Sequence, residues 1–151
     1  MPRVLIVGSE GQLGRELMAA RWPSGAELVG RDLPALDVTS PEVVSEALTR
    51  LAPALVVNAA AYTAVDKAES EPELAHTVNA IAPGVLAEVA GRLGALLVHY
   101  STDYVFNGSG ETPWSEDDAC DPLNVYGATK LAGERAIQAS GCRHLIFRTS
   151  W

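Results

Sequence analysis

The feature of this sequence that most constrains its fold is a series of short apolar runs, each separated from the next by a longer segment of helical character. Residues 4–7 and 55–57 are apolar at every position, which is typical of strands covered on both faces in a parallel sheet. Alternation of such strands with helices predicts an α/β fold, a doubly wound parallel sheet in a three-layer α/β/α arrangement. The five predicted strands are residues 4–7, 27–30, 54–58, 95–101 and 144–148.

Four segments between these strands have the pattern of helices. Ser40 and Pro41 give one of them an N-cap and a first-turn proline, which together mark a helix start. Another contains Pro83-Gly84, where we expect a break, kink or restart because proline lacks the amide donor. Residues 107–122 are rich in Gly, Ser, Asp and Pro and predict a surface loop after a strand end, where ligands bind. The predicted helices cover residues 12–21, a segment that begins at residue 41, residues 73–93 and residues 125–140.

Length and charge narrow the range of functions. A chain of 151 residues fits one domain, residues 1–151. Its formal net charge of −8 disfavours nucleic acid and anionic membranes as partners. The apolar run at residues 4–7 is too short for a signal sequence or a membrane span, so we expect a cytoplasmic protein. A phosphate-bearing ligand would need a local device, such as backbone amides, to hold it against the negative field.

The cysteines and histidines do not form a metal-binding pattern. Cys120 and Cys142 stand alone and are expected to be free buried thiols. His76, His99 and His144 are scattered through apolar stretches and are expected in the core or at its rim. We therefore assign no metal site from these residues.

A glycine-rich loop offers backbone amides that could hold a phosphate-bearing ligand. The first predicted strand runs directly into residues 8–14 (GSEGQLG), which open a helix. Here Gly8 would permit the tight turn, Gly11 would let the backbone approach a pyrophosphate, and Gly14 would let helix and strand pack closely. The loop amides and the helix dipole would face the anion. This context indicates a Rossmann-type site for NADPH or NADH, the alternative being a βα turn that binds nothing.

Two charged residues follow the second predicted strand, about twenty residues after the loop. Asp32 would favour the ribose 2′-hydroxyl of NADH, whereas Arg31 could pair with the 2′-phosphate of NADPH. The dipeptide therefore leaves the choice of cofactor open. Residues 58–61 offer small side chains at another strand end, over which a dinucleotide could lie.

Three residues in the C-terminal half of the chain suggest a catalytic arrangement. Thr102 ends a predicted strand, and Tyr126 and Lys130 lie four apart near a helix start, which puts them on one helical face. A nearby ammonium favours the phenolate and would lower the pKa of the tyrosine. Such a phenol can pass a proton to a carbonyl oxygen that Thr102 also holds. The alternative is an exposed Tyr/Lys pair without function.

Four strings of residues then carry a family resemblance. They are residues 8–14, 57–69 (VNAAAYTAVDKAE), 101–106 (STDYVF) and 126–130 (YGATK), and the likeness extends over the whole chain. The sequence resembles the extended short-chain dehydrogenase/reductases, and most closely the dTDP-4-dehydrorhamnose reductase family. The resemblance implies NADPH- or NADH-dependent reduction of dTDP-4-dehydro-β-L-rhamnose to dTDP-L-rhamnose, a step in the supply of bacterial surface polysaccharides.

The resemblance also implies roles for particular residues. For the cofactor they are Gly11, Gln12 and Leu13 at the pyrophosphate, Asp32, Asp37 and Val38 at the adenosine, and Ala61, Tyr62 and Thr63 along its length. For the substrate they are Thr102, Asp103, Tyr104 and Trp151. Tyr126 would be the proton donor, and Lys130 would hold the nicotinamide ribose and tune Tyr126. Family members can use magnesium at a dimer contact, where Glu16 has a comparable position, but the partner ligands would lie beyond this chain.

Length is the main departure from the family. Its members continue past Ser150-Trp151 into a further strand and a substrate-binding region, so we expect most of the sugar pocket to be missing. The chain is then either a fragment of a full reductase or a shortened protein that retains cofactor-site residues without turnover. A non-catalytic nucleotide-binding subunit and another nucleotide-sugar epimerase or dehydratase are the alternative functions. The intact set of Thr102, Tyr126 and Lys130 favours an enzyme.

Overall fold

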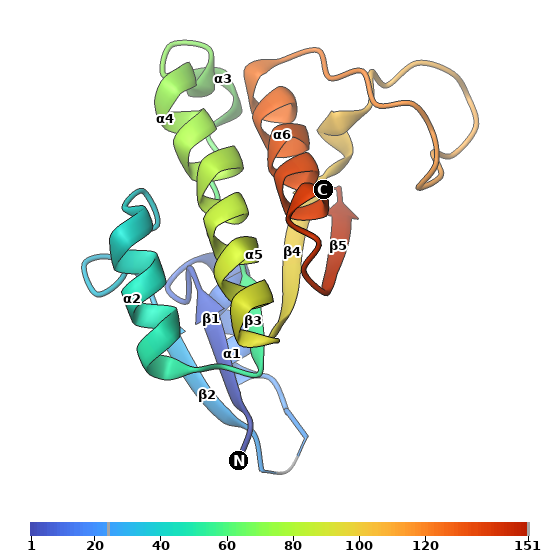
Figure 1. Ribbon diagram of the computed structural model, residues 1–151. Helices are drawn as coiled ribbons and strands as arrows, with labels where there is room; N and C mark the ends of the chain where they lie inside the picture. Colours follow the sequence, from blue (N-terminus) through green and yellow to red (C-terminus); the bar gives the residue numbers. More distant parts are fainter. Residues whose placement is uncertain (24, 151) are drawn as a thin grey trace.

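The structure, a computed structural model, describes residues 1–23 and 25–150 and contains one five-stranded parallel sheet (Figure 1). The strand order is β2-β1-β3-β4-β5, and every neighbouring pair is parallel. All five predicted strands are present, with ends that differ from the prediction by at most one residue. Their bounds are β1 Arg3–Val7, β2 Glu27–Arg31, β3 Leu55–Asn58, β4 Leu96–Thr102 and β5 His144–Thr149.

The helices connect successive strands. Ser40 caps α2 as predicted, because its Oγ accepts a hydrogen bond of 3.4 Å from Val43 N. Asn124 caps α6 in the same way, accepting from Gly127 N at 2.7 Å. The main helices are α1 Gln12–Ala19, α2 Pro41–Leu51, α4 Pro72–His76, α5 Ala82–Leu93 and α6 Val125–Ser140. Short pieces are α3 Val65–Ala68, the π-helical turn η1 Thr77–Ile81 and the 3-10 turn η2 Asp103–Val105.

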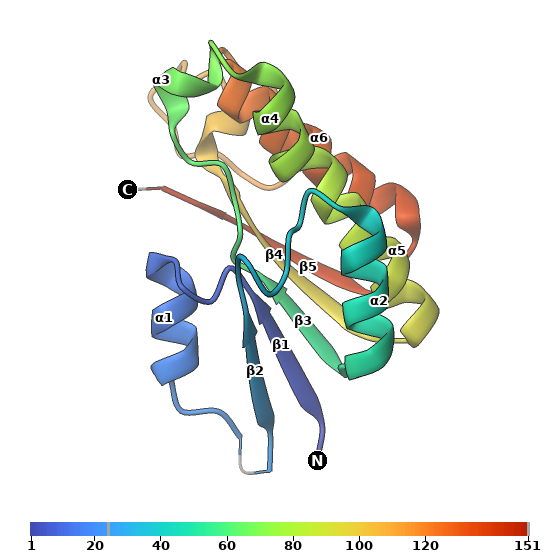
Figure 2. The same ribbon diagram turned by 90° about the vertical axis from the view of Figure 1, so that its left-hand side faces the viewer.

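Helices lie on both faces of the sheet, which confirms the three-layer, doubly wound fold. Figure 2 shows α2, α5 and α6 on one face and α1 on the other. The larger core lies under α2 and α5, where Leu5, Val56 and Leu97 of the sheet meet Val44 and Leu86. The smaller core lies on the side of α1. From β1 the chain passes through α1 to β2 on one side of β1, and then through α2 to β3 on its other side, so the strand order reverses between β1 and β3. Sheets of this kind bind ligands at such a reversal.

The irregularity expected at Pro83-Gly84 lies partly elsewhere. The π-helical turn Thr77–Ile81 comes just before it, and α5 restarts at Ala82 with Pro83 in its first turn. Ala82 donates its amide to the Thr77 carbonyl, five residues back, and this wider π-helical turn accommodates a proline at the next position, which has no amide to donate. The chain therefore continues as one rod from α4 through α5 instead of breaking (Figure 1).

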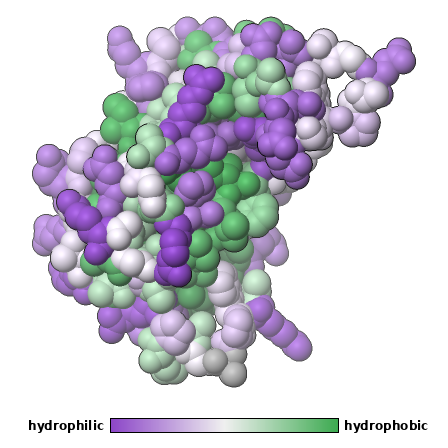
Figure 3. Space-filling model, turned by 45° about the vertical axis from the view of Figure 1, so that its right-hand side comes forward, coloured by the Kyte–Doolittle hydropathy of each residue, from purple (hydrophilic) through white to green (hydrophobic). Residues whose placement is uncertain are grey.

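One part of the sheet has an apolar face toward solvent. On the side of α1, Tyr100 of β4 lies against Phe147 of β5, with ring centroids 5.9 Å apart. Phe147 and Leu145 are 48% and 49% exposed, although α1 covers β1 and β2. Figure 3 shows a hydrophobic area in the middle of the side on which β5 lies. This open face adjoins β5, which forms one edge of the described sheet.

Candidate functional site

The predicted site residues gather at the carboxyl ends of the parallel strands. The glycine loop follows β1, Asp32 follows β2, residues 59–63 follow β3, and Thr102 ends β4. The N-terminal end of α6 brings Tyr126 to the same edge, since the Tyr126 and Tyr104 rings meet edge to face at 5.6 Å. These elements therefore bring the residues together at one edge of the sheet, and their common role as one site stays a prediction.

In the glycine loop, two of the three glycines are required by the protein itself. Gly8 has a positive φ of 79°, and a Cβ there would lie 2.6 Å from Ala60 N. A Cβ on Gly14 would collide with the Gly8 carbonyl oxygen. Gly11 differs, because its φ of −71° suits any residue and the nearest atom to a Cβ would be Gly8 O at 3.4 Å. Gly11 thus leaves an open space at the start of α1, which fits a ligand approaching the backbone.

Asp32 fastens the loop to the end of β2. Its Oδ2 accepts a hydrogen bond of 3.0 Å from Glu10 N, and its Oδ1 accepts one of 2.9 Å from Leu33 N. The Arg31 guanidinium donates to the Gly30 carbonyl at 2.8 Å. The Arg31 carbonyl also accepts from Gly8 N at 2.9 Å, so both residues lie beside the glycine loop, where an adenosine ribose would be read.

The other two residues assigned to the adenosine make local contacts. Asp37 Oδ1 accepts from Thr39 N at 2.9 Å and from Thr39 Oγ1 at 2.6 Å, and these hydrogen bonds lower the pKa of Asp37. Val38 packs against the larger core. Their hydrogen bonding and packing stabilise the segment that leads into α2.

The segment after β3 is held from both sides by buried asparagines that sequence reasoning did not assign. Ala60 N donates to Asn58 Oδ1 at 3.2 Å. Tyr62 N donates to Asn79 Oδ1 at 2.8 Å, and Asn79 Nδ2 donates back to Tyr62 O at 3.0 Å. The signal in the sequence was an amide side chain, Asn79, within an otherwise apolar helical stretch. Ala61, Tyr62 and Thr63 are thereby fixed along the expected path of the cofactor.

The hydroxyl group of Tyr62 is hydrogen-bonded within the protein. It donates to Glu71 Oε2 at 2.6 Å. This hydrogen bond, with burial and the Glu71 charge as smaller causes, raises the pKa of Tyr62 to about 12. The phenol is therefore protonated at neutral pH and acts as a hydrogen-bond donor within the protein.

The three proposed catalytic residues come from β4 and α6. Thr102 is buried, and its Oγ1 accepts from Tyr104 N at 3.2 Å. Lys130 is also buried, and its Nζ donates to the Tyr100 carbonyl at 2.6 Å. Burial lowers the pKa of Lys130 to about 8, against a smaller opposing effect of the Glu134 charge. The ammonium thus lies beneath the strand end that carries Thr102.

The expected lowering of the Tyr126 pKa by Lys130 is not found. Burial raises the pKa of Tyr126, and the nearby Thr102 hydroxyl lowers it by less. The physical reason is that the Lys130 ammonium is directed to the Tyr100 carbonyl, while the half-buried phenol loses solvation that its ionised form would need. In this structure Tyr126 is a protonated phenol, which is the form of an acid.

The start of α6 can approach β4 closely because of Gly127. A Cβ on Gly127 would collide with the carbonyl oxygen of Tyr104 in η2 and lie 3.0 Å from its carbonyl carbon. The absence of a side chain lets the helix bring Tyr126 to the end of β4. The sequence pattern YGATK contains this glycine, but its neighbour across the contact could not be read from the sequence.

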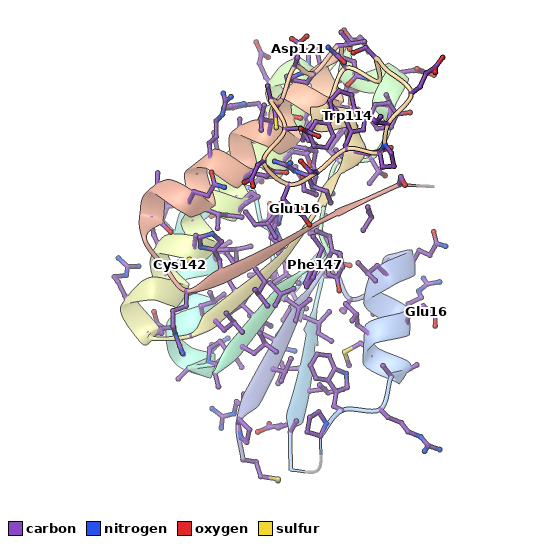
Figure 4. All side chains as sticks on the ribbon, turned by 90° about the vertical axis from the view of Figure 1, so that its right-hand side faces the viewer. Glu16, Trp114, Glu116, Asp121, Cys142 and Phe147 are labelled. Atoms are coloured by element: carbon purple, nitrogen blue, oxygen red, sulfur yellow. The ribbon has the colours of Figure 1, made fainter. Side chains whose placement is uncertain are left out.

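Beyond Thr102, the loop of residues 107–122 borders a cavity of about 540 Å³ next to Asp103. Phe106 stacks on Trp114 with centroids 4.6 Å apart, and Arg148 lies over the Phe106 ring at 5.0 Å. Arg148 forms a two-point ion pair with the buried Glu134, at 2.7 and 3.0 Å. Figure 4 shows Trp114 in this loop and Phe147 on β5.

The other residues that the resemblance assigns to the substrate, and the two cysteines, differ in their exposure to solvent. Asp103 and Tyr104 are exposed at the end of β4, beside the cavity, whereas Trp151 lies outside the described residues. Cys142 is buried as expected, but Cys120 is partly exposed, and its Sγ accepts a hydrogen bond of 3.4 Å from Arg148. Both are free thiols.

Neither a metal cluster nor a membrane span is seen in the part of the chain that the structure describes. Within residues 1–23 and 25–150, no three His, Cys, Asp or Glu side chains gather where they could hold a metal ion. Glu16 is exposed on α1, and Figure 4 shows it directed away from the sheet. No helix among the same residues is long and apolar enough to cross a membrane.

Known proteins are similar to this chain in sequence and in fold. Residues 2–151 match the family described as RmlD substrate binding domain. The dTDP-4-dehydrorhamnose reductases of Salmonella typhimurium and Shigella flexneri are 52% and 51% identical over 98% of this chain. The chain spans about half the length of these curated relatives, 50% in each.

Solved structures of the same kind superpose closely on the whole chain. A dTDP-4-dehydrorhamnose reductase from Clostridium acetobutylicum is 41% identical with a TM-score of 0.95, over 99% of this chain and 53% of its own. One from Bacillus anthracis, in complex with NADP, is 38% identical with a TM-score of 0.96, over 100% of this chain and 54% of its own.

Proposed function

The chain belongs to the RmlD substrate binding domain family, and on that premise we propose that it is the cofactor-binding part of a dTDP-4-dehydrorhamnose reductase and binds NADPH or NADH at the carboxyl end of its sheet. The observation that carries this proposal is the glycine at position 11. Neither its backbone conformation nor its packing requires a glycine there, and the space it leaves is open to a ligand. The Bacillus anthracis relative in complex with NADP supports a nicotinamide dinucleotide as the ligand. We propose further that residues 1–151 act as one NAD(P)-binding domain.

The cofactor would lie across the glycine loop and residues 61–63. Amides at the start of α1 would face its pyrophosphate, and Arg31 and Asp32 would meet its adenosine ribose. When bound, the cofactor supplies the hydride for reduction of a carbonyl carbon. Lys130, below the end of β4, would hold the nicotinamide ribose.

The substrate proposed is dTDP-4-dehydro-β-L-rhamnose, reduced at its 4-keto group to dTDP-L-rhamnose. Tyr126 would donate the proton that the carbonyl oxygen takes up as the hydride reaches carbon, and the Thr102 hydroxyl would hold that oxygen. The raised pKa of Tyr126 keeps its hydroxyl protonated before the reaction. Asp103, Tyr104 and Trp151 would contact the sugar nucleotide.

The test of the cofactor site is Gly11→Val. A valine side chain at the start of α1 would occupy the space of the pyrophosphate, so we expect NADPH affinity to fall at least about a hundredfold in calorimetry, while the exchange of a glycine N-cap for valine lowers the unfolding midpoint only slightly. Ala20→Val, which adds bulk at the other end of α1, is the control and should bind as the wild type does. Equal affinity in Gly11→Val and the wild type would remove the site from this loop.

We expect the chain to use both cofactors. Arg31 favours a 2′-phosphate and Asp32 a free 2′-hydroxyl, and the two lie together at the end of β2. Titration with NADH and NADPH should therefore give dissociation constants that differ by less than about a thousandfold, roughly 4 kcal/mol. A larger preference for either cofactor would show that only one of these side chains reads the ribose.

A further inference from the structure

A buried histidine lies directly beneath the proposed cofactor site and has no part in the chemistry described above. His99 of β4 is 0% exposed, and its partner in the sheet register is Asn58 at the end of β3, which is 2% exposed. Their side chains are joined by a hydrogen bond between Asn58 Nδ2 and His99 Nδ1, with a length of 3.1 Å. The pair lies between the strand ends that carry the cofactor segment and the catalytic threonine.

The position of the imidazole proton follows from the neighbours. Ala60 N–H donates to Asn58 Oδ1 at 3.2 Å, so the amide oxygen of Asn58 must face Ala60 and its NH₂ group must face His99. His99 Nδ1 is then an acceptor, and the ring proton is on Nε2. Burial, with the Lys130 charge as a smaller cause, lowers the pKa of His99 to about 3, so the ring is neutral at physiological pH.

A chain of contacts runs from this ring to the glycine loop. His99 orients the Asn58 amide, and the Asn58 amide holds Ala60 N. Ala60 is the residue against which Gly8 rests, since a Cβ on Gly8 would lie 2.6 Å from Ala60 N and 2.8 Å from its Cα. The position of Ala60 therefore sets both the start of residues 61–63 and the clearance of the glycine loop.

Packing alone does not account for a histidine at this place. His99 Nε2 has no hydrogen-bond partner in the described part of the chain, and a buried unpaired donor is unfavourable. Leucine would fill a similar volume without that cost. What leucine cannot supply is the acceptor at Nδ1, which the Asn58 amide needs in order to face Ala60.

We propose that His99 is a positioning residue for the dinucleotide site, which through Asn58 fixes Ala60 and so the spacing between the glycine loop and residues 61–63. The inference rests on the proposed cofactor function of these two segments. The neutral Nε2–H tautomer is part of it, because a second proton on Nδ1 would turn the acceptor into a donor and release the Asn58 amide.

The wild-type chain tests the tautomer without any cofactor. Nitrogen-15 NMR of the His99 ring should show an unprotonated Nδ1 and a protonated Nε2 at every pH between 5 and 8. An Nδ1–H tautomer, or an imidazolium in that range, would overturn the inference. This measurement also keeps the inference testable if a substitution at His99 prevents folding.

The variants His99→Leu and His99→Asn test the positioning. His99→Leu removes the acceptor, so we expect the NADPH dissociation constant to rise about tenfold and the Ala60 amide to exchange faster with solvent. In His99→Asn, a side-chain oxygen takes the place of Nδ1 and should bring both values back to within about threefold of wild type. Leu97→Ala, a cavity on the same strand and face, is the control for general loss of stability.

The outcomes separate the two proposals. If the wild type binds NADPH and His99→Leu binds it equally well, or no worse than Leu97→Ala does, the positioning role is wrong. If the wild type does not bind NADPH, the proposed function fails, and Ala60 exchange in the variants still decides whether His99 fixes this segment.

Discussion

Lys130 is the residue whose burial has the clearest consequence for stability. The residue is 2% exposed, and its buried ammonium donates a hydrogen bond to the Tyr100 carbonyl. Because burial brings its pKa from 10.5 to about 8, the folded protein binds this proton less tightly than the unfolded chain does. The charged form therefore opposes folding by a constant amount below about pH 8, and this opposition is lost as the pH rises from about 8 to 10.5.

This predicts a stability gain at alkaline pH that depends on Lys130. Between pH 8 and pH 9.5 the free energy of unfolding of the wild type should rise by about 1–2 kcal/mol relative to Lys130→Met, because only the wild type loses this proton on folding. Urea unfolding at several pH values measures the difference. Parallel pH profiles for the two proteins would show that the ammonium is solvated in solution.

The placement of some of these residues could be predicted from the sequence, and the contacts of others could not. The glycine loop was recognisable because its three glycines follow an apolar run at fixed spacing. The wrong expectation for the Tyr126 pKa arose because spacing places Lys130 on the same helical face but does not show that its ammonium bonds to Tyr100. The hydrogen bonds of Asn58, Asn79 and His99 were missed, although His99 was expected in or beside the core, because their partners are 17 to 41 residues away in the sequence.

Among the elements, α6 has the most demanding packing. Gly127 lets its first turn touch the backbone of η2, and the capping bond from Gly127 N to Asn124 fixes where the helix begins. The position of Tyr126 relative to Thr102 therefore depends on a contact made by the neighbouring residue.

We expect Gly127→Ala to lower the free energy of unfolding by about 1–3 kcal/mol, because the added methyl group must push α6 away from Tyr104. The gain in helix propensity of about 1 kcal/mol acts against this loss and is smaller than the strain. Chemical denaturation compares it with Arg135→Ala, an exposed change in the same helix that should be nearly neutral. An equally stable Gly127→Ala would mean that the contact relaxes without cost.

The bounds of the elements followed from local signals where those signals were strong. The helix of residues 125–140 and all five strands were predicted to within one residue, because caps and apolar runs mark their ends. The π-helical turn Thr77–Ile81 was not predicted, since it depends on packing against α6: a Cβ on Gly133 would collide with the Asn79 carbonyl oxygen. Such a contact exists only in the folded molecule.

At the scale of the whole molecule, the chain has about half the length of its reductase relatives. It contains the segments proposed to bind the cofactor and the proposed catalytic residues Thr102, Tyr126 and Lys130, but the relatives it matches are about twice as long. We expect reduction of the 4-keto sugar by the 151-residue chain to be weak or absent, because orientation of the substrate contributes several kcal/mol, up to about 7–11.

Three proteins compared by NADPH absorbance test this expectation: the chain itself, the chain continued by the second half of the Salmonella typhimurium relative, and that longer protein with Tyr126→Phe. The longer protein should be active, and Tyr126→Phe should lower its turnover by about two to four orders of magnitude while leaving cofactor affinity unchanged. Full activity of Tyr126→Phe would refute the proton donor. Full activity of the short chain would place the whole sugar site within residues 1–151.

The open face beside β5 bears on how copies of the chain behave toward one another in solution. An edge strand with exposed Leu145 and Phe147 offers unpaired backbone groups and apolar contact to a second strand. The net charge of −8 keeps copies apart. That repulsion weakens in about 1 M salt, where the Debye length is roughly 3 Å, and vanishes near the isoelectric point of about 4.8. The colloidal stability of the chain therefore rests on charge, and precipitation is expected first in acidic or concentrated salt solutions.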